Sequence, residues 1–520
     1  MRTRNSFFNF LANEGSHLLN IILSFLCRSV FIAVLSQEYL GVNGLFANIL
    51  TVLSLAELGV GTAMTFHIYK PIAEEDEDAQ CRLMNLYRKL YRWIAAFIAA
   101  AGLALVPFLD VLIKDRPDIP HLTFIYLLYL FNTVSSYFFS YKRAIIDAHQ
   151  KQYIGTIVNT IFTTIQFLVQ MLVLVLFKSF IVYLLVQIAC NVLTNIVVAW
   201  EADRLYPYLK KDTKSMPSKD VLASIKKNVG AMFIHRLGSV VVNDTDNLLM
   251  SAFVGIVSVG IYSNYQSIEY AINVALNGVF GAFTASIGNL GALGDEEKTF
   301  RVYKTLNFLG FWLYGFSAVS FMVLYNPFIR WWVDLTGRNG SDYLFNMWII
   351  LAIVVNFYLS GMRTVTLTFR DAMGLYWYDR YKPIFEIIIN LTTSIVLAKT
   401  IGIAGIFLGT TISTLSTSFW VEPYVTYKHG FHQPVSGFFG KYALYAVSVC
   451  GVGGFVYWLC SHITMGGLPE IILRLLVDII VYNGIIFLLY FRTENFRHLR
   501  DQIMVLINAR KKAKEQKKNE

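Results

Sequence analysis

The stretch Ile154–Phe177 reads IGTIVNTIFTTIQFLVQMLVLVLF and contains no charged side chain. A helix needs about 20 mostly apolar residues to cross a bilayer, so this stretch is long enough. Its apolar residues fall on almost every face of a helix, which does not suit a helix at the surface of a water-soluble protein. Phe124–Ser140 and Ile471–Phe491 have the same character. These stretches therefore indicate helices that span a membrane.

Fourteen stretches of this kind, separated by polar links, follow one another along the 520 residues. The composition agrees, because 56% of the residues are hydrophobic and only 15% are charged. We predict an all-α polytopic membrane protein with spans at 8–35, 40–67, 87–109, 121–141, 153–177, 179–200, 229–253, 257–289, 303–325, 343–369, 381–399, 402–426, 439–461 and 469–491.

Lysine and arginine are distributed unequally between the two sides of the predicted spans. The chain has 44 lysine and arginine residues in total. If the N-terminus is inside, six of these basic residues lie in outer links and outer helix ends and four lie deeper within spans. The remaining 34 lie on the inner side. Cytoplasmic loops carry such an excess of basic residues. We predict that both termini are cytoplasmic. The same rule explains the net charge of +10 without a nucleic acid as partner.

Two short segments 216 positions apart resemble each other. Leu40–Phe46 (LGVNGLF) is followed by Asn48, and Ile256–Tyr262 (IVSVGIY) is followed by Asn264. Tight helix packing through small residues explains such segments, but parallel repeats are also typical of transporters whose substrate path lies between the halves. We predict a pseudo-twofold arrangement with an N-lobe at 1–200, a cytoplasmic linker at 201–228, a C-lobe at 229–426, two extra helices within 427–491 and a basic cytoplasmic tail at 492–520.

Polar side chains form a stripe along the first predicted span. On a wheel of 100° per residue, Glu14, His17, Ser24 and Arg28 fall within about 40° of one line. Charge inside a membrane is costly and is commonly functional. A guanidinium can bind phosphate through two parallel hydrogen bonds and stays charged at working pH. Arg28 is therefore a candidate for holding a phosphate, with a structural pair to an internal carboxylate as the alternative.

The seventh predicted span contains a second polar group. Arg236, Asn243 and Asn247 fall within about 20° of one line, and Asp244 and Asp246 flank that line. Such a face can hold a phosphate, sugar hydroxyls or a cation. Its amide and carboxylate oxygens suit Na+, and a buried aspartate can carry a proton. An Arg–Asp network that joins helices is the structural alternative.

Further charges lie in the second, tenth and last predicted spans. Glu57 is either a proton site or a partner for Arg28, and Arg474 and Asp478 have the spacing of a helical pair. One face of the tenth span carries Asn356, Ser360, Arg363 and Arg370. The candidates for the substrate cavity are Arg28, Arg236, Arg363, His17, Ser24, Asn243 and Asn247, and those for coupling to Na+ or H+ are Glu14, Glu57, Asp244 and Asp246.

Signals for catalysis are lacking in the sequence. It has no GxSxG, HExxH or Walker A motif, His17, His67, His121, His149 and His235 are scattered, and no pair of its five cysteines has metal-ligand spacing. We expect a protein that is not an enzyme and has no cofactor or metal site. The longest link, 201–228, is too short for an ATPase domain. Uphill transport would therefore need an ion gradient, the membrane potential or an external partner.

The chain resembles the polysaccharide transporter branch of the multidrug/oligosaccharidyl-lipid/polysaccharide (MOP) exporter superfamily, the Wzx-type flippases. The resemblance rests on the arginine-bearing first span, Leu40–Phe46, Glu57–Gly61 (ELGVG), Thr245–Leu249 (TDNLL) and Val254–Tyr262. It implies two six-helix lobes around a cationic cavity. It also implies alternating access that moves an undecaprenyl-pyrophosphate-linked oligosaccharide from the inner to the outer leaflet of a bacterial plasma membrane.

The resemblance also assigns roles and partners. Arg28 matches the first-helix arginine that is expected to engage the pyrophosphate, and Arg236 and Arg363 are the candidates in the other lobe. The implied partners are the lipid-linked oligosaccharide, membrane lipids and the machinery that assembles the polysaccharide.

Two other functions stay open on the sequence. One is a Na+- or H+-coupled multidrug exporter of the same fold, which the carboxylates of the second and seventh spans favour. The other is a membrane glycosyltransferase or glycan polymerase. Such enzymes usually carry a large outer loop, whereas the longest outer links here, 110–120 and 326–342, are short.

Overall fold

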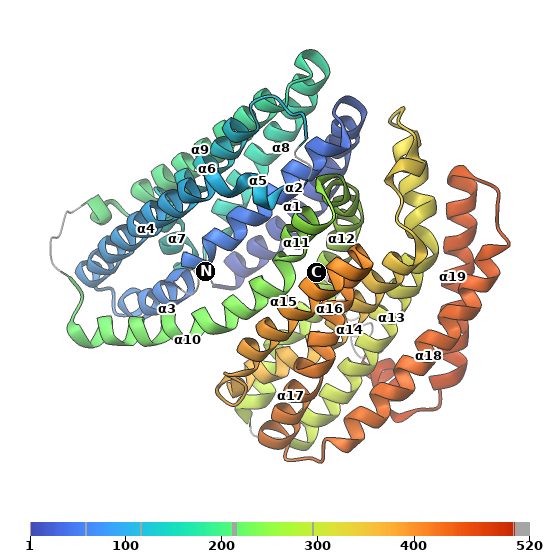
Figure 1. Cartoon of the computed structure of the whole chain (residues 1–520). Helices are drawn as coiled ribbons and strands as arrows, with labels where there is room; N and C mark the ends of the chain where they lie inside the picture. The colour runs from blue at the N-terminus through green and yellow to red at the C-terminus, as the bar shows by residue number, and fades with distance from the viewer. Residues whose placement is uncertain are drawn as a thin grey trace, which may run out of the picture. The chain divides into compact units, whose positions relative to one another are not determined.

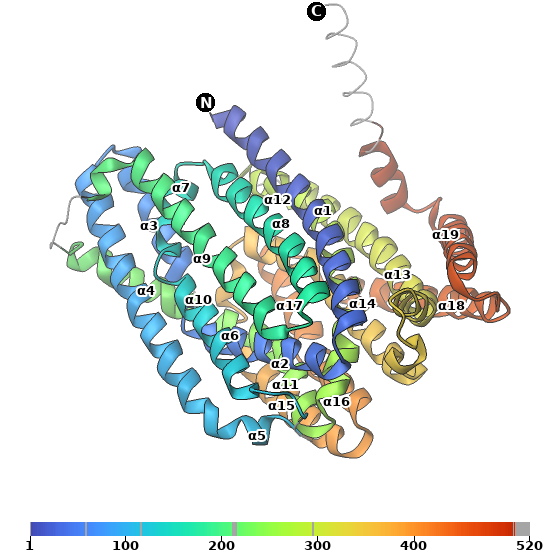
Figure 2. The same ribbon diagram turned by 90° about the horizontal axis from the view of Figure 1, so that it is seen from above.

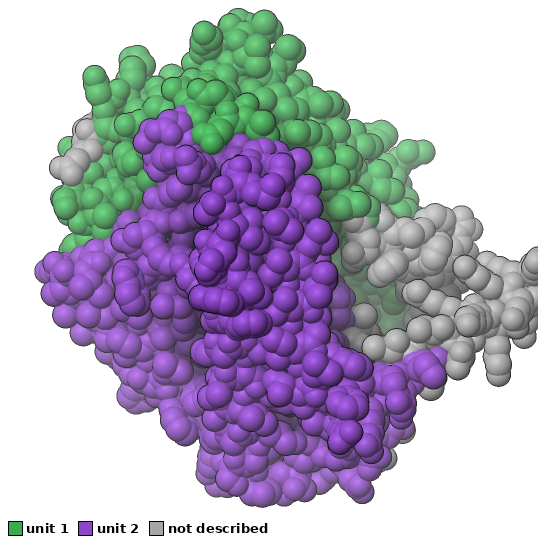
Figure 3. Space-filling model, turned by 90° about the vertical axis from the view of Figure 1, so that its right-hand side faces the viewer, with its two compact units in different colours: residues 1–264, 333–338 green, residues 265–332, 339–520 purple. Residues whose placement is uncertain are grey.

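The structure is a computed structural model that describes residues 2–57, 60–114, 117–210, 216–293, 296–502 and 504. The regular structure of these residues consists of helices, with no strand among them (Figure 1). This confirms the predicted all-α class. The chain divides into two compact units: unit 1 contains residues 1–264 and 333–338, and unit 2 contains residues 265–332 and 339–520 (Figure 3).

Unit 1 contains the helices of the first half of the chain and the two that follow. They are α1 (Arg2–Val34), α2 (Gln37–Leu53), η1 (Ser54–Glu57), α3 (Val60–Ala73), α4 (Glu77–Leu105), η2 (Val106–Phe108), α5 (Leu109–Leu112), α6 (Leu122–Ser136), η3 (Ser140–Lys142), α7 (Arg143–Ala148), α8 (Gln152–Phe177), α9 (Phe180–Leu205), η4 (Pro207–Lys210), α10 (Lys219–Asp244), α11 (Asp246–Phe253) and the start of α12 (Ile256–Leu293).

Polar side chains fix the packing of α1 against α8 in unit 1. Thr160 Oγ1 donates a hydrogen bond of 2.6 Å to Ser16 Oγ, and Thr156 Oγ1 donates one of 2.9 Å to Asn13 Oδ1. Hydroxyl and amide groups commonly join helices where the surroundings are apolar. Figures 1 and 2 both show α8 alongside α9, with which it also packs.

Unit 2 contains the remainder of α12 and the later helices. They are α13 (Glu296–Asp334, up to residue 332), η5 (Gly340–Tyr343), α14 (Met347–Ala372), η6 (Leu375–Trp377), α15 (Lys382–Ile401), α16 (Ile403–Ser416), α17 (Ser418–Val425), the π-helical turn η7 (Thr426–Gly430), α18 (Ser436–Ser461) and α19 (Gly467–Tyr490).

A close hairpin of α15 and α16 organises unit 2. Gly402 joins the two helices with a φ of 64°, a backbone conformation that glycine adopts without steric cost. Ser394 Oγ then donates to the carbonyl oxygen of Ile406 at 3.1 Å. Helix α19 attaches to α13, because Trp312 Nε1 donates to Asn483 Oδ1 at 2.8 Å.

The outer faces of the helices are apolar. On α8, Leu168, Leu172 and Leu176 are 52%, 56% and 63% exposed. An apolar surface of this extent along one helix requires lipid rather than water around it. Eleven helices in the described part of the chain are long and apolar enough to cross a membrane. The chain is therefore a multi-pass membrane protein.

The predicted count of fourteen spans is not confirmed. The stretch 40–67 is divided into α2, η1 and α3, and the stretch 229–253 is divided at Thr245 into α10 and α11. The third stretch outside the eleven, 257–289, lies within the continuous helix α12. Apolar length alone does not reveal a helix break, which explains the difference in the first two cases.

The division into units differs from the predicted lobe boundaries. Helices α10, α11 and the first residues of α12 belong to unit 1, where α10 and α11 pack against α2. The predicted linker 201–228 is also partly helical, since α9 continues to Leu205 and α10 begins at Lys219.

Candidate functional site

The guanidinium of Arg28 is held by two neutral side chains of α12. Its Nε donates a hydrogen bond of 2.8 Å to Asn264 Oδ1, and its Nη2 donates a short one to Ser263 Oγ. Ser263 Oγ in turn donates to the carbonyl oxygen of Gly260 at 2.6 Å. No carboxylate among the described side chains forms an ion pair with Arg28. Its positive charge is therefore uncompensated within the described part of unit 1.

The start of α12 crosses α2 at very short range beside this arginine. A Cβ added at Gly41 would overlap the carbonyl oxygen of Ile256, and one added at Gly260 would overlap that of Gln37. Gly41 and Gly260 belong to the two similar segments found in the sequence. The two copies of the repeat therefore pack against each other, and glycine is what permits the approach.

The other side chains of the first-span stripe lie in different surroundings. His17 and Ser24 are exposed, whereas Cys27, next to Arg28, is buried. Ser24 Oγ donates to the carbonyl oxygen of Ile21. The side chain of Glu14 lies outside the described residues. The stripe thus runs beside the face of α1 that packs on α8.

The predicted polar line on the seventh span is not continuous. α10 ends at Asp244 and α11 begins at Asp246, so one helical wheel does not apply across Thr245. Asp246 and Asn247 are buried, and the half-buried Asp244 accepts at its carbonyl oxygen a hydrogen bond of 3.3 Å from Asn48 Nδ2. The side chains of Arg236 and Asn243 lie outside the described residues.

Glu57 does not pair with Arg28. It lies in η1, where its Oε1 accepts a short hydrogen bond from the hydroxyl group of Tyr91, which is joined to Tyr87 at 3.0 Å between the hydroxyl oxygens. Among the described residues no basic side chain forms an ion pair with this carboxylate. Of the two sequence-based alternatives, the partnership with Arg28 is wrong, and the proton site remains a prediction.

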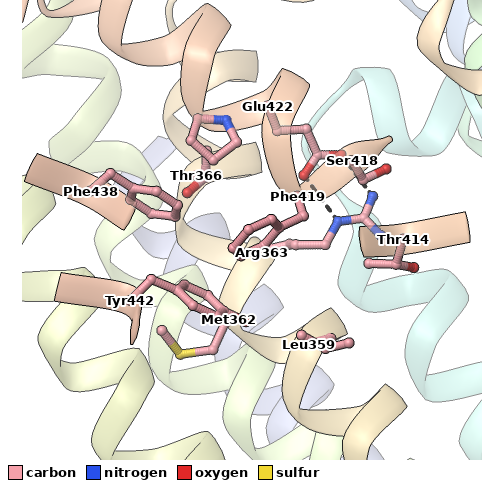
Figure 4. Close-up of a pocket in the computed structure, with 11 residues that line it drawn as sticks. Leu359, Met362, Arg363, Thr366, Thr414, Ser418, Phe419, Glu422, Phe438 and Tyr442 are labelled. Carbon is pink, nitrogen blue, oxygen red and sulfur yellow. Dashed lines mark hydrogen bonds and ion pairs between the residues drawn. The ribbon is translucent and has the colours of Figure 1, made fainter. Parts of the chain in front are cut away.

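Arg363 belongs to a compact charge cluster in unit 2. Its Nε and Nη2 donate to the two carboxylate oxygens of Glu422 at 3.0 and 2.7 Å (Figure 4). Its Nη1 lies 3.5 Å from Glu386 Oε1. Lys382 Nζ lies 2.5 Å from Glu422 Oε1 and 3.5 Å from Glu386 Oε2. Two cations thus face two carboxylates, and the formal charge of the cluster is zero.

A small pocket opens beside this cluster. Arg363, Glu422 and Ser418 meet Phe438 and Tyr442 of α18 around a cavity of about 10 Å³ (Figure 4). A cavity of that size accommodates about one water molecule. The pocket is therefore far too small for a lipid-linked sugar in this conformation.

The pairing of Arg474 differs from the sequence expectation. Arg474 pairs with Glu470 at 2.6 Å rather than with Asp478, which instead accepts a hydrogen bond from Ser320. Sequence reasoning also did not identify Lys382, Glu386 and Glu422 as members of a charge cluster. The available signal was that Lys382 and Glu386 are four positions apart on one helix.

Each half of the chain joins corresponding helices by similar bridges. In the first half, Lys142 bonds to Asp203 at 2.5 Å and Asn191 Nδ2 donates to Asn132 Oδ1 at 2.9 Å, which links the α6–α7 segment to α9. In the second half, the Arg363–Glu422 pair and a 2.6 Å bond from Thr411 Oγ1 to Asn356 Oδ1 link α14 to α16 and α17. The internal repeat therefore extends to tertiary contacts.

In the described part of the chain, no group of three or more His, Cys, Asp or Glu side chains is arranged so that it could hold a metal ion. All five cysteines are free thiols.

Comparison with known structures identifies the fold. A lipid II flippase, MurJ, in an inward closed conformation aligns with a TM-score of 0.64 at 13% identity, over 93% of this chain and 98% of that one. An inward-facing multidrug MATE transporter of the MOP superfamily aligns with a TM-score of 0.60 at 14% identity, over 78% and 94%. A Vibrio cholerae MATE transporter gives 0.55 at 14%, over 83% and 99%. The fold is therefore that of the MOP superfamily.

Sequence comparison is more specific. No curated protein matches the chain in sequence. Residues 4–284, more than half of the chain, match the family model described as "Polysaccharide biosynthesis protein". Because it covers more than half of the chain, this match shows that the chain belongs to the polysaccharide biosynthesis protein family.

Proposed function

We propose that this protein is a flippase that carries an undecaprenyl-pyrophosphate-linked oligosaccharide across the plasma membrane by alternating access, for synthesis of a surface polysaccharide. Family membership and the MOP fold support a transport role in polysaccharide synthesis. The choice of substrate rests on the surroundings of Arg28. It is a cation inside a membrane-spanning helix, and its hydrogen-bond acceptors among the described residues are neutral.

A pyrophosphate suits Arg28 for electrostatic reasons. Attraction between opposite charges is much stronger in surroundings of low dielectric constant than in water. A guanidinium binds phosphoryl oxygens through two parallel hydrogen bonds. The prenyl tail can stay in the lipid while the charged head group meets the arginine. Arg28 therefore serves as the anchor for the anionic part of the substrate.

Arg363 is poorly placed for the same task. Glu422 already occupies its Nε and Nη2 edge, and the surrounding cluster is neutral. An anion that approached it would meet two buried carboxylates. We therefore assign Arg363 to the stability of unit 2 and keep Arg28 as the substrate ligand.

The proposal includes a membrane orientation and partners. Both termini lie in the cytoplasm of a bacterium, in keeping with the excess of basic residues on the inner links. The protein acts without covalent catalysis and passes its substrate to the machinery that assembles the polysaccharide.

A Na+- or H+-coupled multidrug exporter is the second candidate function. The environment of Glu57 favours this function. Its carboxylate lies in the helix break η1 and accepts a hydrogen bond from the Tyr91 hydroxyl group, and it has no basic partner among the described residues. Such a group can take up and release a proton. An exporter of this kind would expel cationic drugs and would not need Arg28.

The test is transport in proteoliposomes. A fluorescent undecaprenyl-pyrophosphate oligosaccharide is placed in one leaflet, and its movement is followed for wild type, Arg28→Ala and Arg301→Ala. Arg301 pairs with Glu297 on an exposed helix face, so Arg301→Ala controls for loss of one positive charge. We expect flipping by wild type and Arg301→Ala but not by Arg28→Ala. Dye efflux that is insensitive to Arg28→Ala, without flipping, would favour the exporter.

A further inference from the structure

The hydrogen bonds of Arg28 use a particular edge of its guanidinium. Nε and Nη2 form the side of the group that can bind a carboxylate or a phosphate through two parallel bonds. In this structure Nε donates to Asn264 and Nη2 donates to Ser263. The edge that would receive an anion is therefore occupied by the protein itself.

The acceptors on α12 are arranged for this contact. Ser263 Oγ gives its proton to the carbonyl oxygen of Gly260, so its lone pairs are left to face Arg28. Asn264 is fully buried, and its Nδ2 has no hydrogen-bond partner among the described residues. A buried amide that is satisfied only at its oxygen holds the arginine less firmly than a complete network would.

The same contact lies beside the glycine crossing of α2 and α12. Gly260 is three positions before Ser263 and packs against the backbone of α2. Ile32 and Leu35 follow Arg28 closely on the chain. Arg338 donates hydrogen bonds to their carbonyl oxygens, at 3.3 Å to Ile32 and 3.5 Å to Leu35. The end of α1 is thus tied to α12 and to the segment 333–338 within unit 1.

We propose that Ser263 and Asn264 form a latch that competes with the substrate for Arg28. This inference rests on the proposed function, in which the pyrophosphate binds that arginine. Hydrogen bonds to an ionised acceptor are stronger than bonds to neutral ones, so a pyrophosphate displaces the latch and frees α1 from α12. Ser263 and Asn264 are positioning residues that set the fraction of protein molecules in which Arg28 is free to bind pyrophosphate.

The latch makes an unusual prediction about affinity. When only part of a population is competent to bind, the apparent dissociation constant rises as the competent fraction falls. Removing a latch acceptor should therefore tighten binding. Replacing Asn264 by a carboxylate should have the opposite effect, because an ion pair would hold Arg28 more firmly.

The test is a calorimetric titration of inorganic pyrophosphate into the full-length protein in nanodiscs. We expect Asn264→Ala to bind about tenfold more tightly than wild type, as follows from loss of one hydrogen bond to a charged group. Asn264→Asp should bind at least about tenfold more weakly. Asn483→Ala, which removes an amide from α19, should leave the affinity unchanged.

The outcomes separate this inference from the proposed function. Weaker or unchanged binding by Asn264→Ala, with wild-type binding that depends on Arg28, would overturn the latch and leave the flippase proposal standing. Binding by Asn264→Asp that is as tight as that of wild type would overturn the latch as well. Wild-type protein that binds no pyrophosphate, or binds it equally after Arg28→Ala, would overturn both. Thermal unfolding of each variant shows whether it is folded.

Discussion

Arg28 and Asp244 lie 216 positions apart, and each is hydrogen-bonded to an asparagine of the opposite repeat. The Arg28 side chain donates to Asn264, and the carbonyl oxygen of Asp244 accepts from Asn48. The two asparagines are also 216 positions apart. The contact between the repeats therefore has internal symmetry in its positions but not in its charge. A cation stands at one of the related positions and an anion at the other.

Glycine at the crossing of α2 and α12 is required for this contact. Exchange of glycine for alanine in a helix interior normally stabilises by about 1 kcal/mol. We expect Gly260→Ala to lower the unfolding temperature instead, because the added methyl group would overlap the backbone of Gln37. Gly278→Ala is the matched control on the same helix, where no atom lies within 4 Å of the new Cβ.

Scanning fluorimetry of the purified variants checks this prediction. Equal or higher unfolding temperatures for both variants would show that α2 and α12 do not pack closely at this point.

The charge cluster of unit 2 should be sensitive to single changes. Loss of one partner from a buried ion pair typically costs about 3–5 kcal/mol, because the other charge is left uncompensated. We expect Arg363→Ala to destabilise the protein by that order. The surface pair provides the comparison, since Arg301→Ala should cost only about 0–1 kcal/mol.

Removal of both partners should be milder than removal of one. In the double variant Arg363→Met, Glu422→Met the remaining Lys382 and Glu386 still balance each other at 3.5 Å. Buried pairs replaced together by apolar residues of similar volume are often neutral in stability. A double variant as unstable as Arg363→Ala would indicate that the pair has a role beyond charge balance.

Asp478 is a buried carboxylate whose Oδ2 accepts a hydrogen bond from Ser320, while its Oδ1 has no hydrogen-bond partner among the residues that the structure describes. A carboxylate charge in such surroundings costs free energy. Asp478→Asn keeps an acceptor for Ser320 and removes the charge, so we expect equal or higher stability, by up to about 2 kcal/mol. Asp478→Leu leaves Ser320 without its acceptor and should be less stable than Asp478→Asn.

Unfolding of both Asp478 variants in detergent distinguishes these cases. A large loss of stability in Asp478→Asn would mean that the negative charge itself is needed.

The apolar stretches were sufficient to predict the fold class, because the requirement to span a bilayer is expressed in local composition. They did not predict the break at Thr245 or the turn η1 at Glu57. Helix breaks in a membrane depend on neighbouring helices that satisfy the backbone groups set free. Such contacts are not visible within a single stretch.

Helical wheels predicted faces but not partners. The wheel placed Arg363 on a polar face of the tenth span, yet its partner Glu422 comes from a helix 59 positions later. Arg474 was compared with Asp478, whereas Glu470 is its partner. A general rule for helices favours the observed pair, because an acidic residue four positions before a basic residue pairs better than an acidic residue four positions after it. Glu470 precedes Arg474, whereas Asp478 follows it.

Arg28, and not Arg363, is expected to hold the anionic head group of the substrate. The measurement is the dissociation constant of undecaprenyl pyrophosphate for nanodisc-embedded wild type, Arg28→Gln and the double variant Arg363→Met, Glu422→Met. Loss of a charge-assisted pair should weaken binding to Arg28→Gln by about 10- to 100-fold, while the double variant binds like wild type. Unchanged affinity in Arg28→Gln together with lost affinity in the double variant would contradict the account.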